Sequence, residues 1–168
     1  MRALAEKGDA HAQTKLGEMY AKRTGQRGSA RNYQTALKWF KLAAKQGDAH
    51  AQFNLGWIFD MALGVPENDQ TAVKWYRLSA EQGHDDGQYY LAWMYENGTG
   101  VSRNYQTAVK WYRLSAQQGN SNAQYMLKKL EISIAEQKSR PTVTAQYQEL
   151  PCQSKTESNA YIYYMIAF

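Results

Sequence analysis

The clearest signal of the fold is an exact repeat: Gln70-Thr71-Ala72-Val73-Lys74-Trp75-Tyr76-Arg77-Leu78-Ser79-Ala80 returns unchanged at Gln106–Ala116, 36 positions later. Other residues keep the same step one unit earlier and at the ends of the units: Ala36, Lys38, Trp39-Phe40, Leu42, Gly47, Gly83 and Gly119. A period of this length is typical of a stacked supersecondary unit. The sequence of 168 residues therefore predicts a solenoid.

The unit that spans residues 48–83 has the pattern of two helices joined by a turn. Asp48 is a favourable N-cap for the first helix, whose apolar residues share one side: Ala51, Leu55, Ile58, Phe59 and Ala62. A turn follows at 64–66, where Pro66 disfavours helix at the preceding residue. The second helix begins near Asn68 as its N-cap and ends at Gly83, a favourable residue for a left-handed C-terminal position.

A small residue recurs inside the first helix of each unit, as Gly17, Gly56 and Ala92. Glycine inside a helix costs about 1 kcal/mol relative to alanine, so its presence needs a packing reason. We expect two helices to approach each other closely at this position.

These motifs resemble the Sel1-like repeat, a relative of the tetratricopeptide repeat. The pattern Ala-Gln-x-x-Leu-Gly-x-x-Tyr, then Gly-x-Gly-Val, is present as Ala51–Phe59 and as Gln88–Tyr95 with Gly98-Thr99-Gly100-Val101. The resemblance covers about residues 1–135. It implies an all-α fold, a right-handed α-α superhelical solenoid of helix pairs in which the first helices line the concave face.

The expected domain organisation is a repeat array followed by a tail. The array covers residues 1–138, with units at about 9–47, 48–83 and 84–119 and a degenerate unit at 120–138; the non-repeat tail covers 139–168. The first unit has three extra residues, in the basic stretch 22–28. The opening residues resemble only the last turns of a second helix. We therefore expect either that the chain is cut from a longer array or that it relies on a partner there.

The tail is rich in Ser, Thr and Gln between Pro141 and Asn159 and ends in the apolar segment Ala160–Phe168. Two interpretations of this segment stay open. It is either a poorly ordered end with a risk of β-aggregation, or a segment that docks into a groove or onto a partner.

Charge is distributed unevenly along the chain, whose net charge is +5. Residues 1–45 carry 10 basic and 3 acidic groups, residues 46–100 carry 2 and 8, and residues 101–140 carry 7 and 2. An acidic middle disfavours a uniform surface for polyanions. The sequence contains no run of about 18 apolar residues, so it predicts no transmembrane helix.

We expect neither a cofactor nor a metal site. The single cysteine, Cys152, excludes both an intramolecular disulfide and a cysteine-rich zinc site. The histidines His11, His50 and His84 lack mutual i,i+4 spacing. No catalytic motif is present, so the sequence predicts a protein that is not an enzyme, and the pair Asp85-Asp86 is interpreted as solvated or capping. The opening residues lack an export signal, which predicts a cytoplasmic protein if Met1 is the true start; otherwise a periplasmic or secreted location stays open.

A row of aromatic residues on the first helices is the candidate partner-binding site. It lies on the side of the helical wheel away from Leu55, and with its flanking polar residues it consists of Phe53, Asn54, Trp57, Tyr89, Tyr90 and Trp93. The first unit has Thr14 and Glu18 at the corresponding places. Two interpretations stay open, because such rings either pack between successive first helices or contact a partner.

We therefore expect a non-enzymatic protein–protein interaction scaffold that holds a partner segment in the concave groove. Bacterial Sel1-like proteins imply an alternative, an immunity or host-interaction protein that engages a specific secreted protein. A second alternative is a helical repeat that binds nucleic acid through basic residues of the second helices. These residues, which otherwise form a solvated face, are Lys38, Lys41, Lys45, Lys74, Arg77, Lys110 and Arg113.

Overall fold

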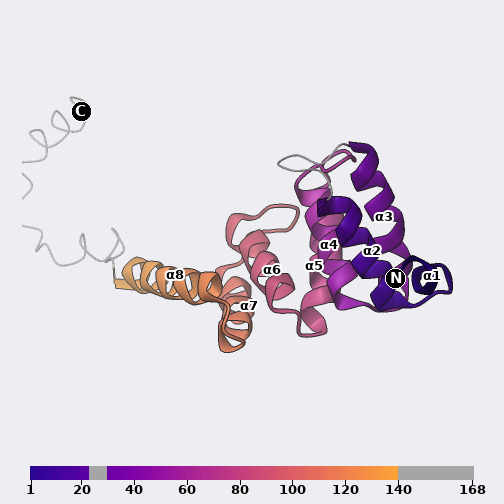
Figure 1. The fold of residues 1–168 in the computed structure, drawn as a ribbon. Helices are drawn as coiled ribbons and strands as arrows, with labels where there is room; N and C mark the ends of the chain where they lie inside the picture. The colour runs from indigo at the N-terminus through magenta and orange to yellow at the C-terminus, as the bar shows by residue number, and fades with distance from the viewer. Residues whose placement is uncertain (23–29, 140–168) are drawn as a thin grey trace, which may run out of the picture. The chain divides into compact units, whose positions relative to one another are not determined.

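The structure is a computed structural model that describes residues 1–22 and 30–139. In these ranges the secondary structure is helical (Figure 1): α1 Arg2–Glu6, α2 Ala10–Lys22, α3 Ala30–Lys45, α4 Ala49–Asp60, α5 Asp69–Glu81, α6 Asp85–Asn97, α7 Tyr105–Gln117 and α8 Ser121–Ser139. The expected all-α fold is confirmed. The basic stretch after Lys22, the tail and Cys152 lie outside the described residues.

Helices pack on one another in chain order within the compact part of the chain, Met1–Ile132. The pairs α2–α3, α4–α5 and α6–α7 form the units, while α3–α4 and α5–α6 join one unit to the next. The last residues of α8, from Ser133, belong to a separate part of the chain. None of the helices in the described ranges is both long and apolar enough to cross a membrane.

Side-chain caps begin the helices where the sequence predicted them. Asp48 accepts a hydrogen bond from the amide of Ala51 at 2.8 Å, and Asn68 accepts one from the amide of Thr71 at 2.8 Å. Beyond α5, Gly83 has a φ of +87°, the left-handed conformation that glycine adopts at lowest cost. One expectation was wrong. Ala62 is exposed with a φ of +52°, because α4 ends at Asp60 before the apolar pattern does.

The recurring small residue sits against a buried aromatic ring. A Cβ atom added to Gly56 would lie 2.5 Å from Cδ1 of Tyr76, and one added to Gly17 would lie 2.6 Å from Cε1 of Phe40. Both rings are fully buried. The predicted close approach is confirmed, since the ring of the second helix occupies the space that a side chain of the first helix would need.

Buried glutamines join the two helices of a unit and also link that unit to the one before it. Gln52 donates to the carbonyl of Ala44 at 3.4 Å and accepts from Gln82 at 2.6 Å. Equivalent bonds join Gln13 to Ala5 and Gln46, and Gln88 to Ala80 and Gln118. Because a buried amide needs its partners, this chain of hydrogen bonds sets the register between units.

Candidate binding surface

The predicted site residues of α4 and α6 are brought together as one half-buried aromatic surface. We use this name, aromatic surface, for Phe53, Asn54, Trp57, Tyr89, Tyr90 and Trp93, which are all of intermediate exposure. Phe53, Trp57, Tyr90 and Trp93 pack against the core formed by α5 and α6. These four rings thus each have one side against the core and another in solvent.

The rings contact each other both within a unit and across the boundary between two units. Phe53 lies 5.9 Å from Tyr76 and 5.7 Å from Tyr90, measured between ring centroids, and Tyr90 stacks on Tyr76 at 5.4 Å. Tyr89 meets Tyr90 edge-on at 5.2 Å and lies 5.7 Å from Tyr112. Such spacings are favourable for aromatic pairs. The rings therefore pack between helices, as one of the two interpretations of the sequence requires.

The same rings remain partly accessible, which keeps the second interpretation open. All five rings are of intermediate exposure. The buried part of Tyr89 and Tyr90 raises the pKa of both hydroxyls, with a further contribution from neighbouring negative charge. Asn54 donates from its side chain to the carbonyl of His50 at 2.9 Å, so its amide is already engaged within α4. Of the six residues, the five aromatic ones therefore form the contact-capable part of the surface.

The first unit lacks this surface. Thr14, at the position of Phe53, is buried and donates to the carbonyl of Ala10 at 3.1 Å. Lys15 and Glu18, at the positions of Asn54 and Trp57, form an ion pair at 3.2 Å. Tyr125 continues the row on α8 and is exposed.

Carboxylates lie next to the aromatic surface and accept hydrogen bonds from buried tyrosines. Tyr76 donates to Asp60 at 3.0 Å, and Tyr112 donates to Glu96 at 2.7 Å. Burial raises the pKa of the Asp60 carboxyl, which the bond from Tyr76 partly offsets. Burial and the facing carboxylates raise the pKa of Tyr76 and Tyr112 far above the usual range, so both stay neutral donors.

A histidine pair borders the surface, and the sequence spacing did not reveal it. His84 stacks on Phe53 at 5.1 Å and accepts the amide of Gly87 at Nδ1, over 3.2 Å. The proton of the neutral ring is therefore on Nε2, which donates to Nδ1 of His50 at 2.7 Å. Burial lowers the pKa of His84, and His50 adds to this effect against Asp86, Asp85 and Asp48. The available signal was that His84 stands at the N-cap position that Asp48 occupies in the preceding unit.

The group His84, Asp85 and Asp86 is the arrangement in the described residues that comes nearest to a metal site, with ligand atoms within 4.8 Å of one another. Its contacts are those of a helix start. Nδ1 of His84 faces an amide proton, and the two carboxylates lie in the first turn of α6, where they complement the helix dipole. We assign the group to capping.

The basic residues of the second helices lie on their exposed sides, away from the core. All seven of the residues named above for a solvated face are exposed. Arg77 donates to the hydroxyl of Tyr95 at 2.7 Å, and Arg113 forms an ion pair with Glu131 at 2.7 Å.

The family model described as "Sel1 repeat" matches residues 10–48, 49–84 and 85–120. The chain belongs to the Sel1 repeat family. Its repeats coincide with the helix pairs α2–α3, α4–α5 and α6–α7. It is thus a helical repeat protein of a scaffold family that is generally non-catalytic.

Solved structures of other Sel1 repeat proteins share this fold. A Sel1 repeat protein from Oxalobacter formigenes is 32% identical over 76% of this chain and 94% of its own, with a TM-score of 0.67. The uropathogenic Escherichia coli protein c5321, described as a protective antigen with an SLR fold, is 39% identical with a TM-score of 0.72. That match covers 79% of this chain and 28% of c5321.

A third structure, the cysteine-rich protein B of Helicobacter pylori, is 18% identical with a TM-score of 0.55, over 71% of this chain and 97% of its own. This likeness concerns the fold alone. No curated protein matches the chain.

Proposed function

We propose that this Sel1 repeat protein is a non-enzymatic scaffold that binds a segment of a partner protein on the aromatic surface. The observation that carries the proposal is the run of half-exposed, mutually packed rings on the first helices of two successive units. Large aromatic residues dominate the energetics of many interfaces.

Packing of the rings against each other favours binding because it holds them in place beforehand. Phe53 contacts Tyr76, Tyr90 and His84, so its ring has little rotamer freedom left to lose. A side chain that is immobilised only on binding costs about 0.5–1.5 kcal/mol. Rings that are already ordered avoid much of this cost.

The charge around the aromatic surface indicates a basic partner segment with apolar anchors. Helices α4 and α6 contain no Lys or Arg, whereas they carry Asp60, Asp85, Asp86 and Glu96. Helices α3 and α7 contain no Asp or Glu. The surface therefore attracts cations, and it disfavours the phosphates of nucleic acids.

A tryptophan exchange tests the proposal. The variant Trp57→Ser/Trp93→Ser changes the aromatic surface, and the matched control Trp75→Ser/Trp111→Ser changes half-buried tryptophans of the second helices. Affinity capture from a lysate of the source organism, with mass spectrometry, identifies bound proteins for both variants and the unchanged chain. We expect a partner that is lost with the first variant only and that is released as salt rises.

Circular dichroism must show that both variants keep their helices. A partner that the folded Trp57→Ser/Trp93→Ser variant retains at full level would contradict the site. Retention of the protein on RNA with a steep salt dependence would contradict the partner class.

A further inference from the structure

A row of exposed leucines runs along the second helices of the three units. Leu42 of α3, Leu78 of α5 and Leu114 of α7 occupy one repeat position and are 45%, 44% and 36% exposed. Leu78 lies on the opposite side of α5 from the buried Tyr76 and Ala80, so it faces solvent directly. A single exposed leucine is ordinary, but here the same position is apolar and exposed in each of the three units. We call these three residues the leucine row.

Lysines accompany the leucine row. Each leucine has a lysine four positions earlier, on the same side of its helix: Lys38, Lys74 and Lys110. These three side chains are exposed. They form no ion pair with a residue of the ranges 1–22 and 30–139. Their charge is therefore available to an anionic ligand.

The second helices carry few carboxylates near the row. Helices α3 and α7 contain no Asp or Glu, and the acidic residues of α5 are Asp69 and Glu81. Lys41 and Lys45 are exposed as well and add positive charge beside Leu42. The two arginines of this side are engaged by the contacts described above. The exposed side of the second helices thus combines apolar side chains with excess positive charge.

Packing between units brings the second helices next to one another. Trp75 of α5 packs against the core cluster that contains Phe40 of α3, and Trp111 of α7 packs against the cluster that contains Tyr76 of α5. Just beyond α7, Gln118 donates to the carbonyl of Gly83, just beyond α5, at 2.9 Å. The leucine row is therefore presented by neighbouring helices of one packed array.

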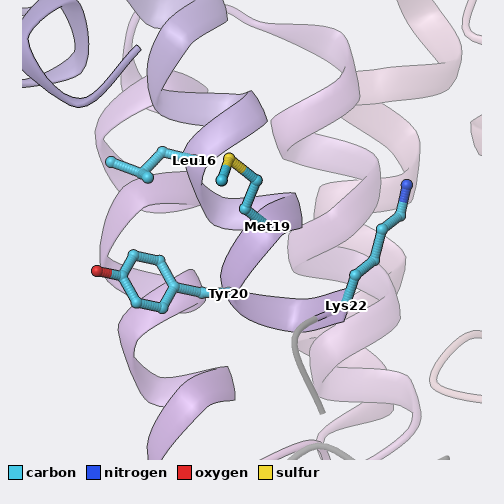
Figure 2. Close-up of a pocket in the computed structure, with 4 residues that line it drawn as sticks. All are labelled: Leu16, Met19, Tyr20 and Lys22. Carbon is cyan, nitrogen blue, oxygen red and sulfur yellow. The ribbon is translucent and has the colours of Figure 1, made fainter. Parts of the chain in front are cut away.

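The leucine row differs in shape from the apolar hollow on α2. That hollow has a volume of about 430 Å³ and is lined by Leu16, Met19, Tyr20 and Lys22. Figure 2 shows Leu16 and Tyr20 extending to the same side of α2. A hollow receives a group of matching shape. Side chains at the centre of an exposed helix side instead suit a partner that deforms around them.

We propose that the leucine row and its lysines form a contact surface for a lipid bilayer that contains anionic headgroups. The lysine ammonium groups meet the headgroups, and the leucines enter the boundary between headgroups and acyl chains. Long lysine stems allow the charges to stay at headgroup level while neighbouring apolar groups lie deeper.

The residue types favour a bilayer over a protein or a nucleic acid. Lysine is depleted in protein–protein interfaces, and leucine is under-represented among the residues that dominate their binding energy. Nucleic acids need cations alone, which leaves the leucines without a role. Stacking on bases needs accessible rings, whereas the rings of Trp75 and Trp111 are half-buried against the core.

The proposal goes beyond the function proposed for the aromatic surface. That surface lies on α4 and α6, which contain no Lys or Arg. The leucine row and its lysines lie on α3, α5 and α7. Because the two surfaces share no residue and differ in charge, each can be tested without the other.

Co-sedimentation of the full chain with vesicles tests the proposal. One set of vesicles consists of phosphatidylcholine, and the other contains about one third phosphatidylglycerol, which makes the surface anionic. At about 0.1 M salt we expect the protein to sediment with the anionic vesicles only, and to be released as the salt concentration rises.

Exchange of the lysines measures the electrostatic contribution. The lysine variant is Lys38→Gln/Lys74→Gln/Lys110→Gln. It should lower partition into anionic vesicles about a hundredfold, because three headgroup contacts are lost. The matched control removes as much charge from exposed lysines outside the second helices, in Lys22→Gln/Lys128→Gln/Lys129→Gln. The control should lower partition less than about tenfold, since only the screened net charge changes.

Exchange of the leucines measures the apolar contribution at constant charge. The leucine variant is Leu42→Ser/Leu78→Ser/Leu114→Ser. It should lower partition at least about tenfold, because less apolar surface leaves water. The matched control exchanges exposed apolar residues elsewhere, in Met19→Ser/Met61→Ser/Ile132→Ser, and should leave partition unchanged. Circular dichroism must show that all four variants keep their helices.

Three results would overturn the proposal. The first is sedimentation that is the same with both sets of vesicles. The second is a lysine or leucine variant that partitions as well as its control, which would place the membrane contact elsewhere, for example in the segment Ala160–Phe168. The third is RNA or an acidic protein that binds the unchanged chain and not the lysine variant, while anionic vesicles bind neither.

Discussion

The first and second units build the same helix pair with different chemistry at its centre. In the second unit the buried ring is Tyr76, whose hydroxyl donates to Asp60, and in the third unit it is Tyr112, which donates to Glu96. The first unit has Phe40 and Ala21 at the corresponding places. The hydroxyl and the carboxylate thus occur together or are both absent, because a buried hydroxyl needs an acceptor.

This difference coincides with the location of the aromatic surface. Units with the tyrosine place a carboxylate at the end of the first helix and have aromatic residues on that helix. The first unit has Ala21 at the position of that carboxylate, and at the positions of the aromatic surface it carries Thr14 and the Lys15–Glu18 ion pair. One backbone arrangement therefore supports a polar unit beside two aromatic, acidic ones.

Both units place a glycine beneath the buried ring, and a larger residue there should be the most destabilising change. Gly56→Leu should lower the free energy of unfolding by about 3 kcal/mol, because the new side chain must displace the Tyr76 ring. Urea denaturation followed by circular dichroism measures this. Asn54→Leu, in the same helix but half-exposed, is the control and should be nearly neutral. Equal stability of Gly56→Leu and the unchanged chain would show that the Tyr76 ring can move aside at little cost.

The pair formed by the Tyr76 hydroxyl and the Asp60 carboxylate can be replaced by the residues that the first unit has there, Phe and Ala. Tyr76→Phe should cost about 1–2 kcal/mol of unfolding free energy, because the half-buried Asp60 carboxylate loses its donor. Adding Asp60→Ala should recover part of that loss, since the double variant matches Phe40 and Ala21. A double-mutant cycle from urea denaturation measures the coupling. Strict additivity would mean that the pair does not act as a unit.

Ser79, whose hydroxyl links α5 to α4, can also be replaced by the residue that the first unit has at this position. Ser79 donates to the carbonyl of Ala49 at 2.8 Å, and the first unit has Ala43 at this position. Ser79→Ala should cost about 1 kcal/mol, because the carbonyl loses a partner. Thermal unfolding compares it with Ser102→Ala, an exposed control. A loss no larger than that of the control would argue that water replaces the hydroxyl.

The start of α6 is capped by a histidine, whereas the other first helices are capped by Asp9, Asp48 and Asn120. Exchanging this cap should change stability only slightly. Burial lowers the pKa of His84 below its ordinary value of 6.5, so the unfolded chain takes up the proton first as pH falls. The contribution of the neutral His84 ring to the free energy of unfolding is therefore complete above the ordinary histidine pKa and declines as pH falls below it.

The measurement is the melting temperature between about pH 7.5 and about pH 5, around the ordinary histidine pKa. His84→Asn keeps a capping residue, like Asn120, and removes the titrating ring. We expect the unchanged chain to lose more stability on acidification than this variant does. Parallel pH profiles for the two proteins would show that protonation of His84 is not linked to folding.

Local features of the sequence were sufficient to predict the helix pairs and the residues that cap their starts. Asp48 and Asn68 cap helices as expected, because a cap needs only the next three residues. The close approach at Gly56 was also predictable, since an internal helical glycine needs a packing reason. Ala62 was assigned to the apolar side wrongly, because periodicity does not show where a helix ends.

Pairs between distant residues were not predictable. Tyr76 and Asp60 are 16 positions apart, and His84 and His50 are 34 apart. Their contact depends on how one helix lies on another, which a single sequence does not record. For the same reason the sequence left open whether the aromatic row packs inside or faces a partner.

The repeat, the helix pairs and the family can all be recognised without a structure, because a 36-residue period and local capping signals are properties of the sequence. The tertiary structure decided which equivalent positions are buried. Met19 and Ile58 occupy one repeat position, yet only Ile58 has a full second helix packed on it. Burial is a property of the neighbours that a residue receives, so equivalent repeat positions can be buried in one unit and exposed in another.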